Sequence, residues 1–269
     1  MSRPPVALTI AGSDPSGGAG IQADLKTFSA LGAYGTSVIT ALTAQNTVGV
    51  TGVHVVPTEF VTQQLETLVA DVRVDAIKIG MLANADIIGA VGEFLCRHPH
   101  EHVVLDPVMV ATSGDRLLDD DAIQAMRDLM PLASLITPNL AEAASLLGTR
   151  PARTLSDMRL HAIALQELGA ARVIIKGGHL DAGPESVDLL LDVDGEALLR
   201  APRVDTVNTH GTGCTLSSAL AALRPQRDSW LEAAFDAKSW LTAALAAADE
   251  LEIGHGHGPV HHFHEFWSD

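Results

Sequence analysis

The feature that most constrains the fold is a series of short apolar segments that recur along the chain with helical patterns between them. Two of these segments read HVVLD at 102–106 and RVIIK at 172–176. Strands without alternation of polar and apolar residues are typical of a sheet covered on both faces, and the intervening helices would supply that cover. The sequence therefore predicts an α/β fold with a mostly parallel central sheet and helices on both faces.

The expected strands lie at 6–10, 36–43, 48–56, 76–79, 102–106, 134–137, 172–176, 187–192 and 196–201. The expected helices lie at 21–31, 58–70, 84–96, 120–130, 140–147, 156–168, 212–223 and 229–250. Asn84 and Ser156 are the candidate N-caps, and Asp194-Gly195 is a favourable two-residue hairpin turn. No repeat, linker or shift in composition divides residues 1–250, so residues 1–269 are expected to form a single domain.

Charge and composition narrow the expected partners and location. Acidic residues number 33 and basic residues 17, which gives a formal charge of −16. This charge repels phosphate backbones and anionic lipid, so neither nucleic acid nor a membrane surface is an expected partner. The first apolar segment, 6–11, is too short for a signal sequence, and no run of 18 apolar residues follows, so a cytoplasmic protein is expected. Cys96 and Cys214 are too few for a disulfide framework.

Loops that follow the predicted strands are the places to look for a site, because ligands gather at the carboxyl ends of strands in open parallel sheets. The first such loop, Gly12 to Gly20 (GSDPSGGAG), allows a ligand to approach the backbone closely and places free amides at a helix start. A flexible turn is the alternative interpretation. The loop matches neither the dinucleotide-binding G-x-G-x-x-G pattern nor the P-loop pattern.

The loop at 208–215, NTHGTGCT, leads directly into the apolar helix at 212–223. Gly211 and Gly213 leave amides uncovered at the positive end of that helix, an arrangement that binds phosphate or a developing oxyanion. Cys214 lies in the first turn, where the helix dipole favours a thiolate. A small buried cysteine without a role is the alternative.

Two further loops complete the candidate set. Asn139 and Glu142 lie three residues apart at the start of the predicted helix 140–147, so they could hold a hydrated Mg²⁺ or simply form a helix-start signal. In Lys176 to His179 a strand delivers a lysine to the ligand edge of the sheet, although lysines at strand ends are commonly just solvated. Together the four loops offer what phosphoryl transfer from MgATP needs: an anion cradle, a metal carboxylate and a lysine.

Seven motifs in order resemble the bacterial hydroxymethylpyrimidine/phosphomethylpyrimidine kinases of thiamine biosynthesis. They stand at 11–27 (AGSDPSGGAGIQADLKT), 40–46 (TALTAQN), 78–81 (KIGM), 106–109 (DPVM), 136–142 (ITPNLAE), 176–179 (KGGH) and 208–214 (NTHGTGC), and the resemblance extends to the tail at 254–264. It implies a ribokinase-like fold, a homodimer, and ATP with Mg²⁺. It also implies two successive phosphorylations, of 4-amino-5-hydroxymethyl-2-methylpyrimidine and then of its monophosphate.

The resemblance also implies residue roles. Gln45 is similar to the residue that hydrogen-bonds the aminopyrimidine edge, for which an amide carries a donor and an acceptor side by side. The same pocket would be lined by Gly12, Asp24, Met81 and Val108, although Asp24 could equally be a solvated acid at its helix start. The nucleotide phosphates would meet Lys176, Lys238 and Thr212. The Mg²⁺ side would be formed by Asp106, Asn139 and Glu142, and the catalytic centre by Lys176, Gly211, Gly213 and Cys214.

Three alternatives stay open at this point. The wider ribokinase superfamily usually has an aspartate base where this chain has Cys214, and cysteine occurs in pyrimidine kinases and in some pyridoxal kinases, which makes pyridoxal kinase the nearest rival. A non-catalytic pyrimidine-binding sensor is the alternative from another class, and it would not need an anion hole. The tail histidines would either hold a metal or form a structural cover over the domain or a dimer contact: His255, His257, His261, His262 and His264.

Overall fold

The computed structural model describes residues 3–109, 120–178, 180 and 183–267. Its strands are β1 (Val6–Ser13), β2 (Tyr34–Gln45), β3 (Val50–Val55), β4 (Ala76–Ile79), β5 (Val103–Leu105), β6 (Leu135–Ile136), β7 (Val173–Ile175), β8 (Glu185–Asp192) and β9 (Gly195–Pro202). Its α-helices are α1 (Gly20–Ala30), α2 (Thr58–Val69), α3 (Ala85–Arg97), α4 (Asp120–Leu129), α5 (Leu140–Leu147), α6 (Leu155–Glu167), α7 (Thr212–Leu223) and α8 (Trp230–Ala246).

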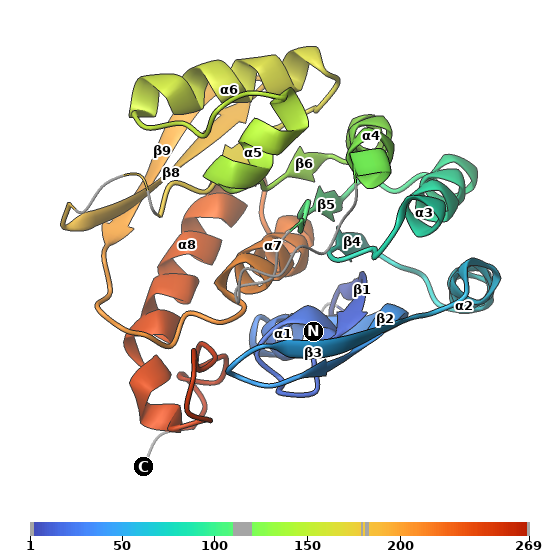
Figure 1. The fold of residues 1–269 in the computed structure, drawn as a ribbon, viewed down its shortest axis with the longest axis horizontal. Helices are drawn as coiled ribbons and strands as arrows, with labels where there is room; N and C mark the ends of the chain where they lie inside the picture. Colours follow the sequence, from blue (N-terminus) through green and yellow to red (C-terminus); the bar gives the residue numbers. More distant parts are fainter. Residues whose placement is uncertain (1–2, 110–119, 179, 181–182, 268–269) are drawn as a thin grey trace.

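The strands form one nine-stranded sheet in the order β3-β2-β1-β4-β5-β6-β7-β8-β9 (Figure 1). Strands β2, β1, β4, β5, β6 and β7 pair in parallel, whereas β3, β8 and β9 pair antiparallel. The predicted mostly parallel sheet is therefore confirmed. The predicted hairpin is confirmed as well, because Asp192 at the end of β8 pairs with Gly195 at the start of β9. Its two-residue turn is Val193-Asp194 and not the predicted Asp194-Gly195, since Gly195 is already the first residue of β9.

The sheet lies between two layers of helices (Figure 1). Apolar side chains pack between the sheet and each layer and form two cores. Helices α2 to α6 cover one face, and α1, α7 and α8 cover the other. Successive strand residues alternate between the cores: Leu8 and Ile10 face the first, and Ala7 faces the second. Burial on both faces explains why the strands read as continuous apolar runs.

Local capping rules fix where the helices begin. Asn84 caps α3, as predicted, because its side chain accepts the Ile87 N–H at 2.9 Å. The predicted cap Ser156 is wrong. The N-cap of α6 is Thr154, which forms a capping box with Asp157, so Ser156 lies inside the first turn.

The topology gathers the candidate loops at one edge of the sheet. β1 lies between β2 and β4, which is the point where the strand order reverses, and ligand sites form outside the carboxyl ends at such a point. The loops after β1, β5, β6 and β7 all leave this edge, because these strands run parallel.

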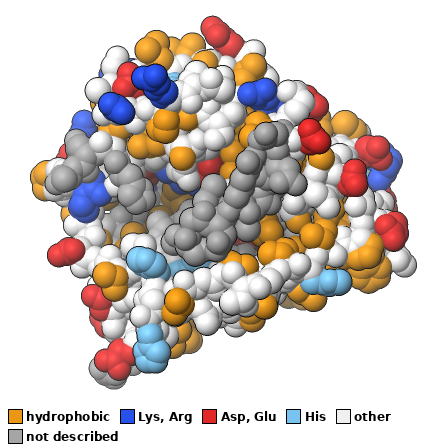
Figure 2. Space-filling model, in the orientation of Figure 1, with side chains coloured by type: hydrophobic (Ala, Val, Ile, Leu, Met, Phe, Trp, Pro, Cys, Tyr) orange, Lys and Arg blue, Asp and Glu red, His pale blue; other side chains and the backbone are white. Residues whose placement is uncertain are grey.

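Strands β2 and β3 form an exposed hairpin at one end of the sheet. Apolar side chains of β2, β3 and their connection are exposed: Leu42, Val48, Val53 and Val55. Figure 2 shows hydrophobic side chains over the lower part of the face, where Figure 1 places this hairpin. Across the described residues, no helix combines the length and the apolar character needed to cross a membrane.

Candidate active site

The start of α7 forms a turn whose backbone amides are suited to an anion. Gly211, the N-cap residue, has a φ of 77°, and a Cβ there would lie 1.8 Å from the carbonyl oxygen of Gly18 in the first glycine loop. Only glycine fits so close an approach. The helical ladder begins where the Thr215 N–H donates to the Gly211 carbonyl, so the N–H groups of Gly213 and Cys214 precede it. Both predicted glycines therefore shape this turn.

Lys176 and Asp106 meet beside Gly213. A Cβ on Gly213 would lie 3.2 Å from Lys176 Nζ and 3.7 Å from Asp106 Oδ2. Lys176 Nζ donates to Asp106 Oδ1 at 2.7 Å and lies 3.8 Å from Glu142 Oε2. Burial opposes the charge on Lys176, but the two carboxylates outweigh it and raise the Lys176 pKa. The charged Lys176 ammonium therefore lies at the start of α7. Four of the predicted site residues come together here: Asp106, Glu142, Lys176 and Gly213.

Glu142 and Asn139 have separate tasks. Burial raises the Glu142 pKa to about 7, with Asp106 adding to the rise and Lys176 opposing it. The side-chain oxygen of Asn139 accepts the N–H groups of Ala141 and Glu142, both at 2.9 Å, in a capping box. These bonds use both of its lone pairs, so the structure favours the helix-start interpretation for Asn139 over the predicted Mg²⁺ contact. Asp106 and Glu142 remain as carboxylates suited to a hydrated Mg²⁺, which needs only one or two.

Cys214 lies half-buried in the first turn of α7. Burial raises the pKa of its thiol, and the ammonium of Lys78 opposes that rise only in part. The free protein therefore carries a neutral thiol at neutral pH, in contrast to the thiolate expected from the helix dipole.

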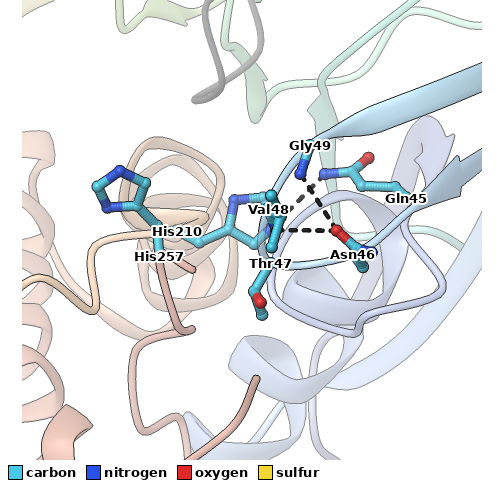
Figure 3. Close-up of a pocket in the computed structure, with 7 residues that line it drawn as sticks. All are labelled: Gln45, Asn46, Thr47, Val48, Gly49, His210 and His257. Carbon is cyan, nitrogen blue, oxygen red and sulfur yellow. Dashed lines mark hydrogen bonds between the residues drawn. The ribbon is translucent and has the colours of Figure 1, made fainter. Parts of the chain in front are cut away.

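Gln45, the predicted pyrimidine contact, lies at the end of β2. Its amide nitrogen lies 3.3 Å from His210 Nε2, and the two side chains face each other in Figure 3. They border a cavity of about 20 Å³, lined also by 46–49 and His257. Gly12 and Met81 are neighbours, since a Cβ on Gly12 would lie 3.3 Å from Met81 Sδ. Val108 follows Asp106 and is partly exposed.

Asp24 does not line this pocket, and it is not solvated either. Its carboxylate is fully buried and accepts bonds from Lys78 Nζ at 2.8 and 2.9 Å, from Thr9 at 2.6 Å and from Ser218 at 2.6 Å. These bonds tie α1, β1 and β4 to α7, one turn beyond Cys214. The only sequence signal for this buried hydrogen-bond network was a lysine inside the apolar strand AIKI at 76–79.

Lys238 also has buried partners. Its ammonium donates to Asp188 at 2.7 Å and to Ser186 at 3.0 Å, both on β8. Asp188 in turn accepts the Gly177 N–H at 2.9 Å, so Lys238 acts on the loop after Lys176 through Asp188. The structure thus places Lys238 at β8 and not at Gly213. The predicted nucleotide residue Thr212 is partly exposed at the start of α7 and donates to the Thr209 carbonyl at 2.7 Å.

His210 is a central residue that the sequence did not single out. Its Nε2 lies 2.8 Å from Asp14 Oδ2, and its backbone N–H donates to the Gly258 carbonyl at 3.0 Å. Burial favours a neutral Asp14, but bonds from His210, Ser16 and Ala19 hold its pKa below the ordinary value. His210 therefore connects the first glycine loop, the Gln45 side chain and the tail. His179 of the KGGH motif lies outside the described residues.

The tail packs over the site loops. The His257 N–H donates to the Thr47 carbonyl at 2.9 Å, and the Gly258 N–H donates to the Asn208 side chain at 3.0 Å. Thr215 in α7 is 3.0 Å from Nε2 of the buried His262, whose pKa burial lowers to about 3. Among the described residues no group of three or more His, Cys, Asp and Glu side chains could hold a metal ion, and this includes the tail histidines. The cover interpretation of the tail is the one these contacts support.

Comparison with known proteins decides the family. The phosphomethylpyrimidine kinase family model matches residues 14–261. The chain belongs to the phosphomethylpyrimidine kinase family. A hydroxymethylpyrimidine/phosphomethylpyrimidine kinase from Salmonella typhimurium is 60% identical over 262 residues, which are 97% of this chain and 98% of that protein. The resemblance found in the sequence is confirmed.

Solved structures confirm the ribokinase-like fold of this phosphomethylpyrimidine kinase family member. The ADP complex of Bacillus subtilis pyridoxal kinase has a TM-score of 0.91 at 37% identity, covering 99% of this chain and 100% of that one. Phosphomethylpyrimidine kinase from Clostridium difficile has a TM-score of 0.80 at 40% identity, covering 90% of this chain and 100% of that one. Both vitamin kinase activities thus occur on closely similar folds.

Proposed function

We propose that this protein transfers the γ-phosphoryl group of ATP to the hydroxyl of 4-amino-5-hydroxymethyl-2-methylpyrimidine, and then to the phosphate of the resulting monophosphate. Family membership supports the reaction. The observation that carries it is the arrangement at Gly213, where a half-buried lysine and a buried carboxylate adjoin helix-start amides. Such amides and cations stabilise the charge that develops during phosphoryl transfer.

Each half of the site has a task in this reaction. The amides from Gly211 to Cys214 and the ammonium of Lys176 hold the transferring phosphoryl group, and Thr212 contacts the nucleotide. Gln45 binds the aminopyrimidine edge, with Gly12, Met81 and Val108 around the ring. Asp24 holds α7 in place through Lys78 and Ser218, and Lys238 holds the loop after Lys176 through Asp188.

Asp106 and Glu142 are the residues that would hold Mg²⁺, whose charge offsets that of the nucleotide phosphates. Lys176 Nζ lies 2.7 Å from the Asp106 carboxylate and 3.8 Å from the Glu142 carboxylate, so its ammonium partly neutralises both in the free protein. Glu142 must be ionised to bind a cation. Mg²⁺ affinity should therefore fall as the pH drops below about 7, the Glu142 pKa.

Cys214 in its thiolate form is proposed as the base for the first step, in which a neutral alcohol must lose its proton. Burial keeps the thiol neutral in the free protein, so only the ionised fraction can act, and the Lys78 ammonium favours that fraction. In the second step the attacking phosphate oxygen is already ionised near neutral pH, and no base is needed.

Pyridoxal kinase is the second candidate, because solved pyridoxal kinases are structurally close to this chain. Incubation of the purified protein with MgATP and each candidate alcohol, followed by mass identification of the product, decides between them. Mono- and diphosphorylated aminopyrimidine support the proposal, and phosphorylated pyridoxal alone supports the rival. Absence of ADP release above background with the pyrimidine would point to a non-catalytic sensor.

We also propose that the protein is a cytoplasmic homodimer. The exposed apolar side chains of the β2–β3 hairpin are a candidate contact between two copies, with Val48 72% and Leu42 47% exposed. Multi-angle light scattering should give twice the chain mass of 28.2 kDa. A Leu42→Lys variant that stays dimeric would place the contact elsewhere.

A further inference from the structure

The amide of Gln45 has a polar neighbour on each side. Its Oε1 lies 3.1 Å from the hydroxyl of Thr43, and its Nε2 lies 3.3 Å from Nε2 of His210 (Figure 3). An amide offers a pure acceptor and a pure donor, so the polarity of each neighbour decides which way it is held.

Both neighbours have their polarity set by a third group. The Thr43 hydroxyl lies 2.9 Å from the Ser13 carbonyl, which can only accept, so its single proton points there and it presents a lone pair to Gln45. His210 Nε2 lies 2.8 Å from Asp14 Oδ2. Bonds from His210, Ser16 and Ala19 keep Asp14 ionised, and a carboxylate only accepts. The His210 proton therefore resides on Nε2.

From these polarities the amide has one matched orientation. With oxygen toward Thr43 it sets two acceptors face to face, and with nitrogen toward His210 it sets two donors face to face. A half-turn about the last side-chain bond exchanges the two atoms. The amide N–H then donates to the free lone pair of the Thr43 hydroxyl, and the amide oxygen shares the His210 Nε2–H with Asp14 in a three-centre bond. In that orientation one oxygen lone pair and one N–H remain for a ligand.

We propose that His210, held by Asp14, and Thr43, held by the Ser13 carbonyl, lock the orientation of the Gln45 amide and so determine which donor–acceptor edge the pocket accepts. The proposal rests on the proposed function in taking Gln45 as the ring contact. It makes His210 and Thr43 positioning residues for specificity, acting through Gln45.

A fixed orientation matters because an amide that rotates freely cannot discriminate between the two possible edges of a pyrimidine ring. A 4-aminopyrimidine presents an amino donor beside a ring-nitrogen acceptor, whereas the 4-oxo analogue presents a carbonyl acceptor beside a ring N–H donor. An unlocked glutamine turns over and pairs equally well with either edge. A locked one leaves two polar pairs mismatched for the wrong edge, and sites built on such pairs reject the wrong ligand strongly.

The test compares kcat/KM for 5-hydroxymethyl-2-methylpyrimidines that carry a 4-amino or a 4-oxo group, at saturating MgATP. His210→Gln substitutes a group whose own polarity can turn over, and Thr43→Val removes the hydroxyl. Each variant should lower the amino-to-oxo preference at least about tenfold. The ratio cancels any common loss that follows from disturbing the anion turn. If a variant is too slow to assay, the ratio of the two ligands' dissociation constants from calorimetry replaces it.

Thr51→Val is the matched control. Thr51 lies on β3 of the same hairpin, donates to the Ala44 carbonyl at 3.0 Å and is exposed, so its ratio should equal the wild-type ratio. An unchanged preference in both His210→Gln and Thr43→Val would overturn the lock while leaving the proposed function intact. A wild-type protein that neither phosphorylates nor binds the 4-amino compound would instead overturn the proposed function, and the lock with it.

Discussion

Glu142→Gln should change how the stability of the protein depends on pH. Glu142 is buried in α5, and burial raises its pKa from 4.5 to about 7. Between these values the folded protein keeps a proton that the unfolded chain has released, so stability falls as the pH rises through this window. Glutamine cannot titrate, and its side-chain oxygen can still accept the Asn139 N–H of the capping box.

The magnitude follows from linkage. A carboxyl with these two pKa values loses about 2.5 kcal/mol of its contribution to folding between pH 5 and pH 8. The free energy of unfolding of Glu142→Gln, relative to wild type, should therefore rise by about that amount over the same range. Groups remote from Glu142 titrate alike in both proteins and cancel in the difference, and the raised pKa of Lys176 keeps its ammonium charged throughout this range.

Urea unfolding at pH 5, 6, 7 and 8, in EDTA and followed by the fluorescence of the three tryptophans, measures this difference. Glu93→Gln, whose glutamate side chain is 78% exposed on α3, is the control and should follow wild type at every pH. A Glu142→Gln difference that is constant across the four pH values would refute the assignment of a raised pKa to this buried carboxyl.

Three further outcomes are expected at the site. Cys214→Ala should slow phosphorylation of the alcohol about 10²-fold or more and that of the monophosphate far less, and an equal slowing of both would rule out a base. Because burial raises the thiol pKa, the wild-type alcohol step should also speed up with rising pH. Gln45→Leu should raise the pyrimidine KM about 5- to 150-fold with little change for ATP, since it costs about 1–3 kcal/mol of polar pairing, whereas equal rises would indicate a structural residue. Gly213→Val should slow both steps in a coupled ADP assay, because its side chain would displace Lys176 Nζ, and normal rates would separate this turn from the chemistry.

Local patterns in the sequence were sufficient to predict the strands, the helices and the glycine turn at the start of α7. Continuous apolar strands, the β8–β9 hairpin and the Asn84 cap depend on a few neighbouring residues, and the structure confirms each of them, with the hairpin turn one residue earlier than predicted. Gly211 and Gly213 were identifiable because helix-start amides follow from the loop-to-helix pattern alone.

The partners of buried charges could not be predicted, because they come from distant strands and helices. Asp24 meets Lys78 across 54 positions and Lys238 meets Asp188 across 50, and nothing local distinguishes such residues from pocket residues. Asn139 shows a different limit. The same residue type at a helix start suits a cap and a metal contact, and only the two bonds to its side-chain oxygen decide between them.

The tail contacts have a consequence for synthesis of the chain. The Gln45 side of the candidate site is built from β1, β2 and β4, which leave the ribosome before α7 and before the residues that hold α7 in place, as far as His262. The two halves of the site are therefore fastened together only after synthesis has passed His262. A nascent chain stopped before Gly254 would have its central sheet but neither Gly258 to hold the His210 backbone nor His262 to cover Thr215.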